Sequence, residues 1–473
     1  MGNIGPIRNA TVDLRPLNVL IGPNNSGKSI FATGMYAAWS RAAADYAARR
    51  IRLGKHFSAI PDDKAYEASA YIFEKLEEGK APQVEDVPAV MTDIFDDLLK
   101  EIMNLYARGM VTEFERIFGT PLIELRRRQK RLTKGLISVR SMRPTWSIEM
   151  EISSRGTKTA ISPPHLAEVW PKAGTHSWRR IKRRTDHVQG LPRTYLLREM
   201  ATEIAKNCFR EVPLHTKYLP AARSGLLQSH KTLAASMVRR AAMAGVEELK
   251  IPAMSGVVVD FLGELLELEP RESSSFADEA LQLEREILSG TVRLEDDAFG
   301  YPEIIYTHGQ GDYPLARTSS MISEIAPIVV YLRHILMRND HLVIEEPEAH
   351  LHPASQTALA RCICRLVNKG LRVSLTTHSE FFLQQLNNSI VASAIGESDA
   401  NEVGFGPDMR LSPNKVGAYL FEPTESGTEV HPLEVSADSG ISQSSFSEVE
   451  EKLYGESVVL SRRLEEDEED EGQ

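Results

Sequence analysis

The sequence contains few cysteines and no long apolar run. These two features argue against a disulfide-stabilised protein and against a membrane-spanning one. Its 473 residues include three cysteines, Cys208, Cys362 and Cys364. Three cysteines make no disulfide framework, so we expect a reducing compartment. Cys362 and Cys364 lie in a helical pattern without a second cysteine pair, which predicts buried small side chains rather than a zinc site. No apolar run approaches the roughly 18 residues of a membrane-spanning helix, and no signal pattern opens the chain. We therefore expect a cytoplasmic protein with no membrane contact.

Charge is unevenly distributed along this chain of net charge −11. An unbroken acidic run, 465–471, predicts a solvated, disordered end. Basic clusters at 126–131 and 179–184 are typical of solvated helix faces, and they are also candidate contacts to nucleic acid. The rest is ordinary globular composition, with 42% hydrophobic and 26% charged residues. The length allows two or three domains, or one large domain with insertions.

Residues 22–29 read GPNNSGKS, a complete phosphate-binding loop between an apolar strand and a helical pattern. Its glycines allow backbone N–H groups to cradle phosphate oxygens at the start of a helix. Lys28 is expected to reach the β- and γ-phosphates, and the Ser29 hydroxyl to hold Mg²⁺. The residues predicted to bind ATP here are Gly22, Asn24, Asn25, Ser26, Gly27, Lys28 and Ser29.

A second motif follows the apolar run 341–344, which ends in Glu345 and Glu346. An apolar strand that ends in two acids places both carboxylates at the carboxyl edge of a parallel sheet, where ligands bind in open α/β sheets. An acidic strand-to-helix turn would show the same letters, but the phosphate loop favours a catalytic pair. We predict that Glu345 is the Mg²⁺ ligand and that Glu346 orients and deprotonates the attacking water.

A third candidate, His378, follows the apolar strand expected at 373–377. A lone histidine is more often structural. At the edge of the next strand, however, its ring can hydrogen-bond the γ-phosphate or the attacking water, so we place it with Lys28 and Glu346 among the catalytic residues.

Three stretches together, GPNNSGKS, EEPEAHLHP at 345–353 and TTHS at 376–379, resemble the ABC-class ATPase heads of the RecF, SMC and OLD group. They are most similar to the prokaryotic AAA family ATPases of the AAA-15/AAA-21 type. The resemblance covers roughly 1–40, 216–225 and 300–455, whereas residues 45–215 carry little of it. It implies ATP and Mg²⁺ as ligands and a composite site shared by two protomers.

The resemblance also assigns a signature motif to residues 317–324, with Ser319 and Ser320 as the residues that bind nucleotide. In this class the signature opens a helix whose N-terminus points at the γ-phosphate held by the second protomer. An ordinary serine N-cap would explain the same letters. The resemblance further implies that 350–353 is a dimer-contacting loop and that Arg223 stands where relatives keep a polar sensor residue. The chain departs from the group in having Glu345 where an aspartate is usual.

We therefore expect an α/β fold of the ABC-type P-loop ATPase head, with a parallel core sheet, an antiparallel β lobe and helical insertions. The expected parts are an N-terminal ATPase part at 1–45, a variable insertion with helices and a β hairpin at 46–215, a strand and helical subdomain at 216–300, the C-terminal ATPase part at 301–440, and a helix with the acidic tail at 441–473. Patterns inside these parts predict a strand at 10–14, a loop over 153–190, a short helix at 381–386 and a polar-faced helix at 445–464.

The expected function is ATP binding and slow hydrolysis in a homodimer or higher oligomer. After Ser379 about 95 residues remain, and they show no strand-borne Glu followed by an Asp-x-Asp strand, so we expect no TOPRIM nuclease centre. Three roles stay open: the sensor or regulatory subunit of an anti-phage defence system with a separate nuclease or toxin effector, a RecF-like repair ATPase that binds DNA ends or gaps, and an ATP-switched scaffold that binds only protein.

Overall fold

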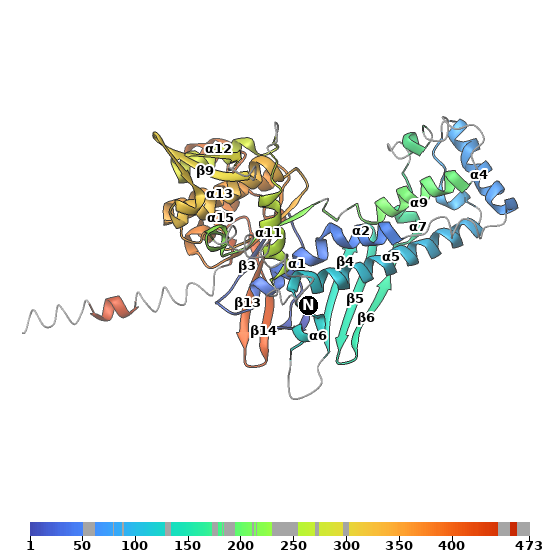
Figure 1. Cartoon of the computed structure of the whole chain (residues 1–473), viewed down its shortest axis with the longest axis horizontal. Helices are drawn as coiled ribbons and strands as arrows, with labels where there is room; N and C mark the ends of the chain where they lie inside the picture. Colours follow the sequence, from blue (N-terminus) through green and yellow to red (C-terminus); the bar gives the residue numbers. More distant parts are fainter. Residues whose placement is uncertain are drawn as a thin grey trace, which may run out of the picture.

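A computed structural model describes most of the chain (Figure 1). The described residues are 1–50, 62–127 without 79 and 88, 134–172, 178–183 without 182, 194–228 without 211 and 214, 254–269, 274–296, 302–442 and 455–460. The acidic run, residues 128–131 of the first basic cluster, residues 182 and 184 of the second, and most of the helix expected at 445–464 lie outside these ranges. No helix in the described ranges is long and apolar enough to cross a membrane.

One eleven-stranded mixed sheet runs through the molecule in the order β6-β5-β4-β1-β2-β14-β13-β3-β12-β11-β7. Its strands are β1 (Gly2–Ile4), β2 (Ile7–Asn9), β3 (Leu17–Ile21), β4 (Gly135–Met142), β5 (Thr145–Ser153), β6 (Gly156–Ser162), β7 (Thr216–Leu219), β11 (His341–Glu345), β12 (Arg372–Thr377), β13 (Val416–Thr424) and β14 (Gly427–Leu433). A separate three-stranded sheet contains β8 (Thr291–Asp296), β9 (Pro302–His308) and β10 (Gly311–Pro314), and β15 (Val435–Ser436) pairs with β16 (Gly440–Ile441).

The sheet has a parallel block and an antiparallel wing. Strands β13, β3, β12, β11 and β7 are consecutive and parallel. β3 and β11 are buried along their whole length, as expected for strands covered on both faces. At the other end, β6, β5, β4, β1 and β2 pair antiparallel. Since all strands of the parallel block end at one edge, the segments that follow them meet there.

Helices cover both parts of the sheet. They are α1 (Lys28–Trp39), α2 (Arg41–Arg50), α4 (Asp62–Glu77), α5 (Ala89–Phe118), α6 (Leu122–Leu125), α7 (Leu166–Val169), α9 (Thr194–Cys208), α11 (Gly256–Leu266), α12 (Ala277–Leu283), α13 (Ser320–Val330), α14 (Pro353–Asn368), α15 (Glu380–Val391) and α16 (Glu397–Glu402). Short 3-10 turns lie at η1 (Val84–Asp86), η3 (Leu315–Arg317) and η5 (Pro413–Lys415), and π-helical turns at η2 (Glu284–Leu288) and η4 (Tyr331–Ile335).

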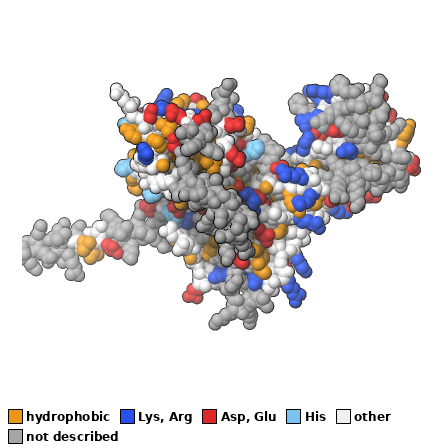
Figure 2. Space-filling view, in the orientation of Figure 1, with side chains coloured by type: hydrophobic (Ala, Val, Ile, Leu, Met, Phe, Trp, Pro, Cys, Tyr) orange, Lys and Arg blue, Asp and Glu red, His pale blue; other side chains and the backbone are white. Residues whose placement is uncertain are grey.

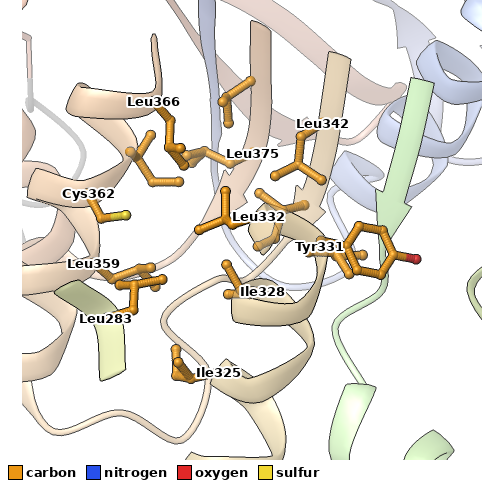
Figure 3. Close-up of a cluster of buried hydrophobic side chains, with 14 of the residues drawn as sticks. Leu283, Ile325, Ile328, Tyr331, Leu332, Leu342, Leu359, Cys362, Leu366 and Leu375 are labelled. Carbon is orange, nitrogen blue, oxygen red and sulfur yellow. The ribbon is translucent and has the colours of Figure 1, made fainter. Parts of the chain in front are cut away.

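The largest apolar cluster joins the parallel block to the helices α12, α13, α14 and α15. In Figure 3, Leu342 and Leu375 of the sheet face Ile328, Leu332 and other side chains of the surrounding helices. Cys362 is fully buried in this cluster beside Leu359 and Leu366, and Cys364 is buried on the same helix. The prediction that both are small buried side chains is confirmed, and burial raises the pKa of the Cys364 thiol to about 11.

A second compact unit lies at the far end of α5, away from the parallel block (Figure 1). It is formed by α4, α7, α9 and the N-terminal part of α5, and we call it the distal lobe. Its core has its own buried cluster, with Phe95, Trp170, Trp178 and Ile204 among its members. The lobe and the strands β4 to β6 both fall within 46–215, so this stretch contributes to the main sheet as well as to a separate helical unit.

Several local expectations were wrong. Residues 10–14 form no strand. The strands that precede β3 are instead the shorter β1 and β2, which pair with each other. The stretch 153–190 contains β6 and α7, and β6 is a solvent-facing edge strand whose polar composition hid it. The helix expected at 381–386 extends over Glu380–Val391. In contrast, the β hairpin expected within 46–215 is present as β4 and β5, and a strand, β7, begins the part expected at 216–300.

Candidate functional site

The predicted site segments meet at the carboxyl edge of the parallel block. The loop 22–29 follows β3, His378 follows β12, Glu345 ends β11, and Arg223 lies just after β7. These four strands are direct neighbours, and their last residues are in register: Thr377 pairs with Ile21, and Glu345 with Thr376. Sequence positions more than 300 residues apart are therefore brought to one row by strand order alone.

The phosphate-binding loop depends on its glycines for conformation and for space. Gly22 has φ 148 and Gly27 has φ 93, a region that residues with a Cβ rarely adopt. A Cβ on Gly22 would lie 2.5 Å from the carbonyl oxygen of Phe421. Asn25 also has a positive φ of 61, which asparagine tolerates. Ser26 is fully buried and its Oγ has no hydrogen-bond partner, whereas Asn24, Asn25 and Ser29 are exposed.

Lys28 begins α1 and turns its ammonium back into the loop. Its Nζ donates hydrogen bonds of 2.8 Å to the carbonyl oxygens of both Gly22 and Pro23, and only 5% of the residue is exposed. Burial lowers the pKa of Lys28 to about 8, and the negative charges of Glu346, Glu348 and Glu345 oppose this shift. The cation is thus held between loop carbonyls and carboxylates, next to N–H groups that suit an anion.

Glu345 is a buried carboxylate with an unused oxygen. Its Oε2 accepts a hydrogen bond of 3.2 Å from the backbone N–H of Ala221, while the buried Oε1 has no hydrogen-bond partner. An orphaned carboxylate oxygen is costly unless a ligand completes it. Hard oxygen donors such as this atom and the Ser29 hydroxyl, in the first turn of α1, are the ligands that Mg²⁺ prefers. The residues present therefore fit the expected cation.

Glu346 differs from Glu345 in exposure and in backbone strain. Its side chain is 40% exposed, so solvent reaches it, and its Oε1 lies 3.4 Å from Nε2 of His378. The hydrogen bond from His378 is the main cause that lowers the pKa of Glu346, and Lys28 and Arg223 add to it. At neutral pH it is a carboxylate that can accept a proton. Its φ of 41 is strained for a non-glycine residue.

Glu348 also lies at the carboxyl edge of the parallel block, although its sequence pattern was not assigned a role in the site. It is 8% exposed, and its Oε1 accepts hydrogen bonds from the Thr377 hydroxyl (2.6 Å) and from the backbone N–H of His378 (2.9 Å). Its Oε2 is buried without a hydrogen-bond partner. Glu348 thus fixes the segment that carries His378. The signal that could have revealed it is the third acid in the run at 345–348.

The signature segment presents two exposed serines. Ser319 is the N-cap of α13 and Ser320 is its first residue, and both are exposed. Ser319 therefore has the N-cap position that the alternative of an ordinary serine cap expects, although its side chain makes no capping hydrogen bond. Among the described residues, neither serine side chain hydrogen-bonds to the loop 22–29. The N-terminus of α13 is therefore exposed at these two residues.

Behind these serines, Glu324 of α13 is completely buried and forms an ion pair with Arg223, with 2.8 Å between Oε2 of Glu324 and Nε of Arg223. Arg223 also donates to backbone oxygens of the Glu345–Glu346 segment. The loop expected to contact a second protomer shows exposed His350 and His352, and His352 caps α14 by accepting a hydrogen bond from Ala354 N.

The basic clusters do not both project into solvent. Arg127 donates hydrogen bonds to the carbonyl oxygens of Ser426 and Pro6, so it attaches the tip of the β13–β14 hairpin. Arg180 of the second cluster pairs with Glu203. Figure 2 shows other Lys and Arg side chains over the region of α2, α5 and the strands β4 to β6. Arg49 of α2, Arg108 of α5 and Lys158 of β6 are exposed.

Parts of this chain are similar in sequence to known proteins. Residues 264–383 match the family model described as the AAA ATPase domain, a range that includes the signature segment, Glu345, Glu346 and His378. "Protein ea59" of Escherichia phage lambda is 27% identical over 157 residues, which are 32% of this chain and 29% of the phage protein. The chain thus matches less than a third of the length of this relative.

Among solved structures, an SMC head bound to the C-winged helix domain of ScpA aligns with 91% of this chain and 96% of its own at a TM-score of 0.38 and 10% identity. The SMC head domain from Thermotoga maritima aligns with 92% of this chain and 97% of its own at a TM-score of 0.34 and 10% identity. The family match confirms the resemblance to AAA family ATPases, and the mixed α/β sheet with its parallel block confirms the predicted fold class. Within residues 264–383, the chain is similar to the AAA ATPase domain.

Proposed function

We propose that the protein binds ATP with Mg²⁺ at the carboxyl edge of the parallel block and hydrolyses it slowly. The observation that carries this proposal is the position of Lys28, buried at a helix start and surrounded by the charges of Glu345, Glu346 and Glu348. An isolated structural lysine would gain nothing from such a site, because burial destabilises its charged form. A polyphosphate with its cation explains both the lysine and the unused carboxylate oxygens.

Each residue has a separate task in this proposal. The loop N–H groups and Lys28 bind the phosphates, while Ser29 and Glu345 would hold the cation, which neutralises charge on the phosphate oxygens when bound. Glu346 is the solvent-reachable carboxylate, so it accepts the proton of the attacking water. His378 orients Glu346 and lies close enough to the same edge to contact the γ-phosphate. Catalysis rests on positioning and electrostatic stabilisation.

The active form in this proposal is a homodimer or higher oligomer with composite sites. The exposed N-terminus of α13, with Ser319 and Ser320, supports it, because this helix start has no partner in the loop of its own chain among the described residues. A helix N-terminus with free hydroxyls suits the γ-phosphate of ATP bound by the other protomer.

Complementation between two inactive variants tests both parts of the proposal. Lys28→Ala should lose ATP binding in calorimetry, because no other cation in the loop replaces its phosphate contact, whereas the control Lys217→Ala, on β7, should keep it. Ser320→Arg should bind ATP but not hydrolyse it. Mixing the two should restore turnover, since each mixed dimer has one intact composite site. Absence of complementation, or full activity in a proven monomer, would refute the composite site.

For the biological role, we propose an ATP-dependent regulatory subunit of a defence system that acts with a separate effector. The distal lobe supports this role, because it is a folded unit apart from the ATP edge and offers a surface for a trigger or a partner. The exposed basic side chains near α5 support DNA binding as a second candidate. Purified protein should leave linear and supercoiled DNA intact with Mg²⁺ or Mn²⁺ and ATP. Cleavage that persists in Lys28→Ala would overturn the role, and salt-sensitive DNA binding would favour the second candidate.

A further inference from the structure

The position of Arg223 is not explained by the role of a polar sensor residue that the resemblance assigns to it. It lies in the turn after β7, it is 0% exposed, and it is among the largest fully buried side chains of the protein. Burying a guanidinium is costly unless its donors are paired. All of the acceptors that the structure gives it belong to three places: the turn itself at Pro220, the Glu345–Glu346 segment, and Glu324 of α13.

On one side Arg223 holds the backbone of the two acidic residues. Its Nη1 donates to the carbonyl oxygen of Glu345 at 2.8 Å, and its Nη2 donates to that of Glu346 at 3.2 Å. The strained φ of Glu346 persists only if its surroundings determine it. The Glu346 N–H is held by Thr376, through both the backbone carbonyl and the hydroxyl, and the Glu346 carbonyl by Arg223.

On the other side Arg223 and its neighbour hold the signature helix. Nε of Arg223 lies 2.8 Å from Oε2 of Glu324, and the second carboxylate oxygen accepts a hydrogen bond of 3.1 Å from the N–H of Ser224. Glu324 is one turn beyond the exposed Ser320 on α13. A shift of this helix end therefore has to move Arg223 or break a buried ion pair, and either change reaches the carbonyl of Glu346.

We propose that Arg223 is a positioning residue that couples the signature helix of a protomer to the catalytic carboxylate of the same protomer. The coupling rests on the composite site proposed above. There, α13 touches the ATP of the partner, while Glu346 acts on the ATP of its own chain. Engagement of one site thus sets the geometry of the other, and the two sites of a dimer hydrolyse ATP cooperatively.

Two conservative variants test the coupling. Arg223→Lys keeps the charge but loses the planar fork that reaches Glu324 and two carbonyls at once. Glu324→Gln keeps the volume and removes the ion pair, so it serves if the first variant fails to fold. In wild type we expect a Hill coefficient for ATP hydrolysis that approaches about 2. In both variants it should fall to about 1, with kcat lowered on the order of 10- to 100-fold and the ATP affinity of the free protein unchanged.

A matched control is Glu264→Gln, which removes the carboxylate that pairs with Lys217 of β7 at 2.7 Å but leaves Arg223 untouched. This variant should keep the wild-type Hill coefficient. If general destabilisation caused the loss of cooperativity, the control would lose it as well. A wild-type coefficient of about 1, or variants that retain wild-type cooperativity, would overturn the coupling. A wild type that binds no ATP, or that hydrolyses it as a monomer, would instead refute the proposed function itself.

Discussion

The distal lobe and the ATP edge bury polar groups in opposite ways. In the lobe core, the indole N–H groups of Trp170 and Trp178 donate to the carbonyl oxygens of Pro82 and Pro171 at 2.9 and 2.7 Å. At the edge, by contrast, Glu345 Oε1, Glu348 Oε2 and Ser26 Oγ are buried without hydrogen-bond partners. Among the described residues of the lobe, no polar side chain is buried without a hydrogen-bond partner, as expected for a core arranged for folding. The edge leaves groups unsatisfied, as a binding site does before its ligand arrives.

The largest expected effect is a loss of unfolding free energy when a core side chain is truncated in either region. Trp170→Ala should remove the contacts of this ring with Phe95 and Trp178 and cost about 3–5 kcal/mol, concentrated in the lobe. ATP affinity should stay unchanged. Leu342→Ala, in the buried strand beside the site, should cost roughly 2–5 kcal/mol and weaken ATP binding as well. Thermal unfolding by circular dichroism and calorimetric titration with ATP measure both. Loss of ATP binding in Trp170→Ala would break the comparison.

A second prediction makes the same chemical change in each region. Glu346→Gln keeps the size of the side chain but removes the proton acceptor, so kcat should fall on the order of 100-fold or more while ATP remains bound. Glu203→Gln, in the lobe, removes a buried carboxylate that pairs with Arg180 and Lys206. It should lower the melting temperature without changing kcat. Steady-state turnover, calorimetric titration with ATP and thermal unfolding provide the readouts, and wild-type turnover in Glu346→Gln would contradict the assignment of the base.

The smallest expected effect is the uptake of a fraction of a proton by Lys28 when ATP binds. Lys28 has a pKa of about 8 before ATP binds, because burial disfavours its charge. Phosphate charge raises that pKa, so binding at pH 8.5 should take up protons, and ATP affinity should fall as the pH rises above about 8. Calorimetric enthalpies in buffers of different ionisation enthalpy should therefore differ at pH 8.5 and agree near pH 6.5. In Lys28→Arg, which stays charged, the difference should vanish. Buffer-independent enthalpies in wild type at pH 8.5 would show that the lysine is already charged.

The linkage of Lys28 to folding has the opposite sign to its linkage to ATP binding. The unfolded chain holds a proton on Lys28 up to its ordinary pKa of 10.5, whereas the folded chain releases it near 8. Between these values the unfolded state binds more protons, so this residue contributes stability that increases with pH over that window. Without ATP, Lys28 therefore destabilises the fold at neutral pH, as is common for groups selected for binding.

Local pattern predicted some parts of this protein well. Glycine spacing predicts the loop 22–29, and apolar runs predict the buried strands β3 and β11. The edge strand β6 did not, because its solvent-facing residues lack the apolar alternation that marks a half-buried strand. Glu348 was missed for a related reason: an acid in a turn looks solvated until the next strand supplies its donors.

The sequence by itself determined the chemistry available at the site. It placed a lysine after a glycine-rich turn and acids at the end of an apolar strand, since these features depend only on neighbours along the chain. Tertiary structure decided which of these groups act on one another. Strand order set His378 beside Glu346, and the turn after β7 brought Arg223 between Glu324 and the acidic pair. Such contacts join residues 30 to more than 100 positions apart, and their geometry follows from how strands pair and how α13 packs against the sheet, which no local pattern encodes.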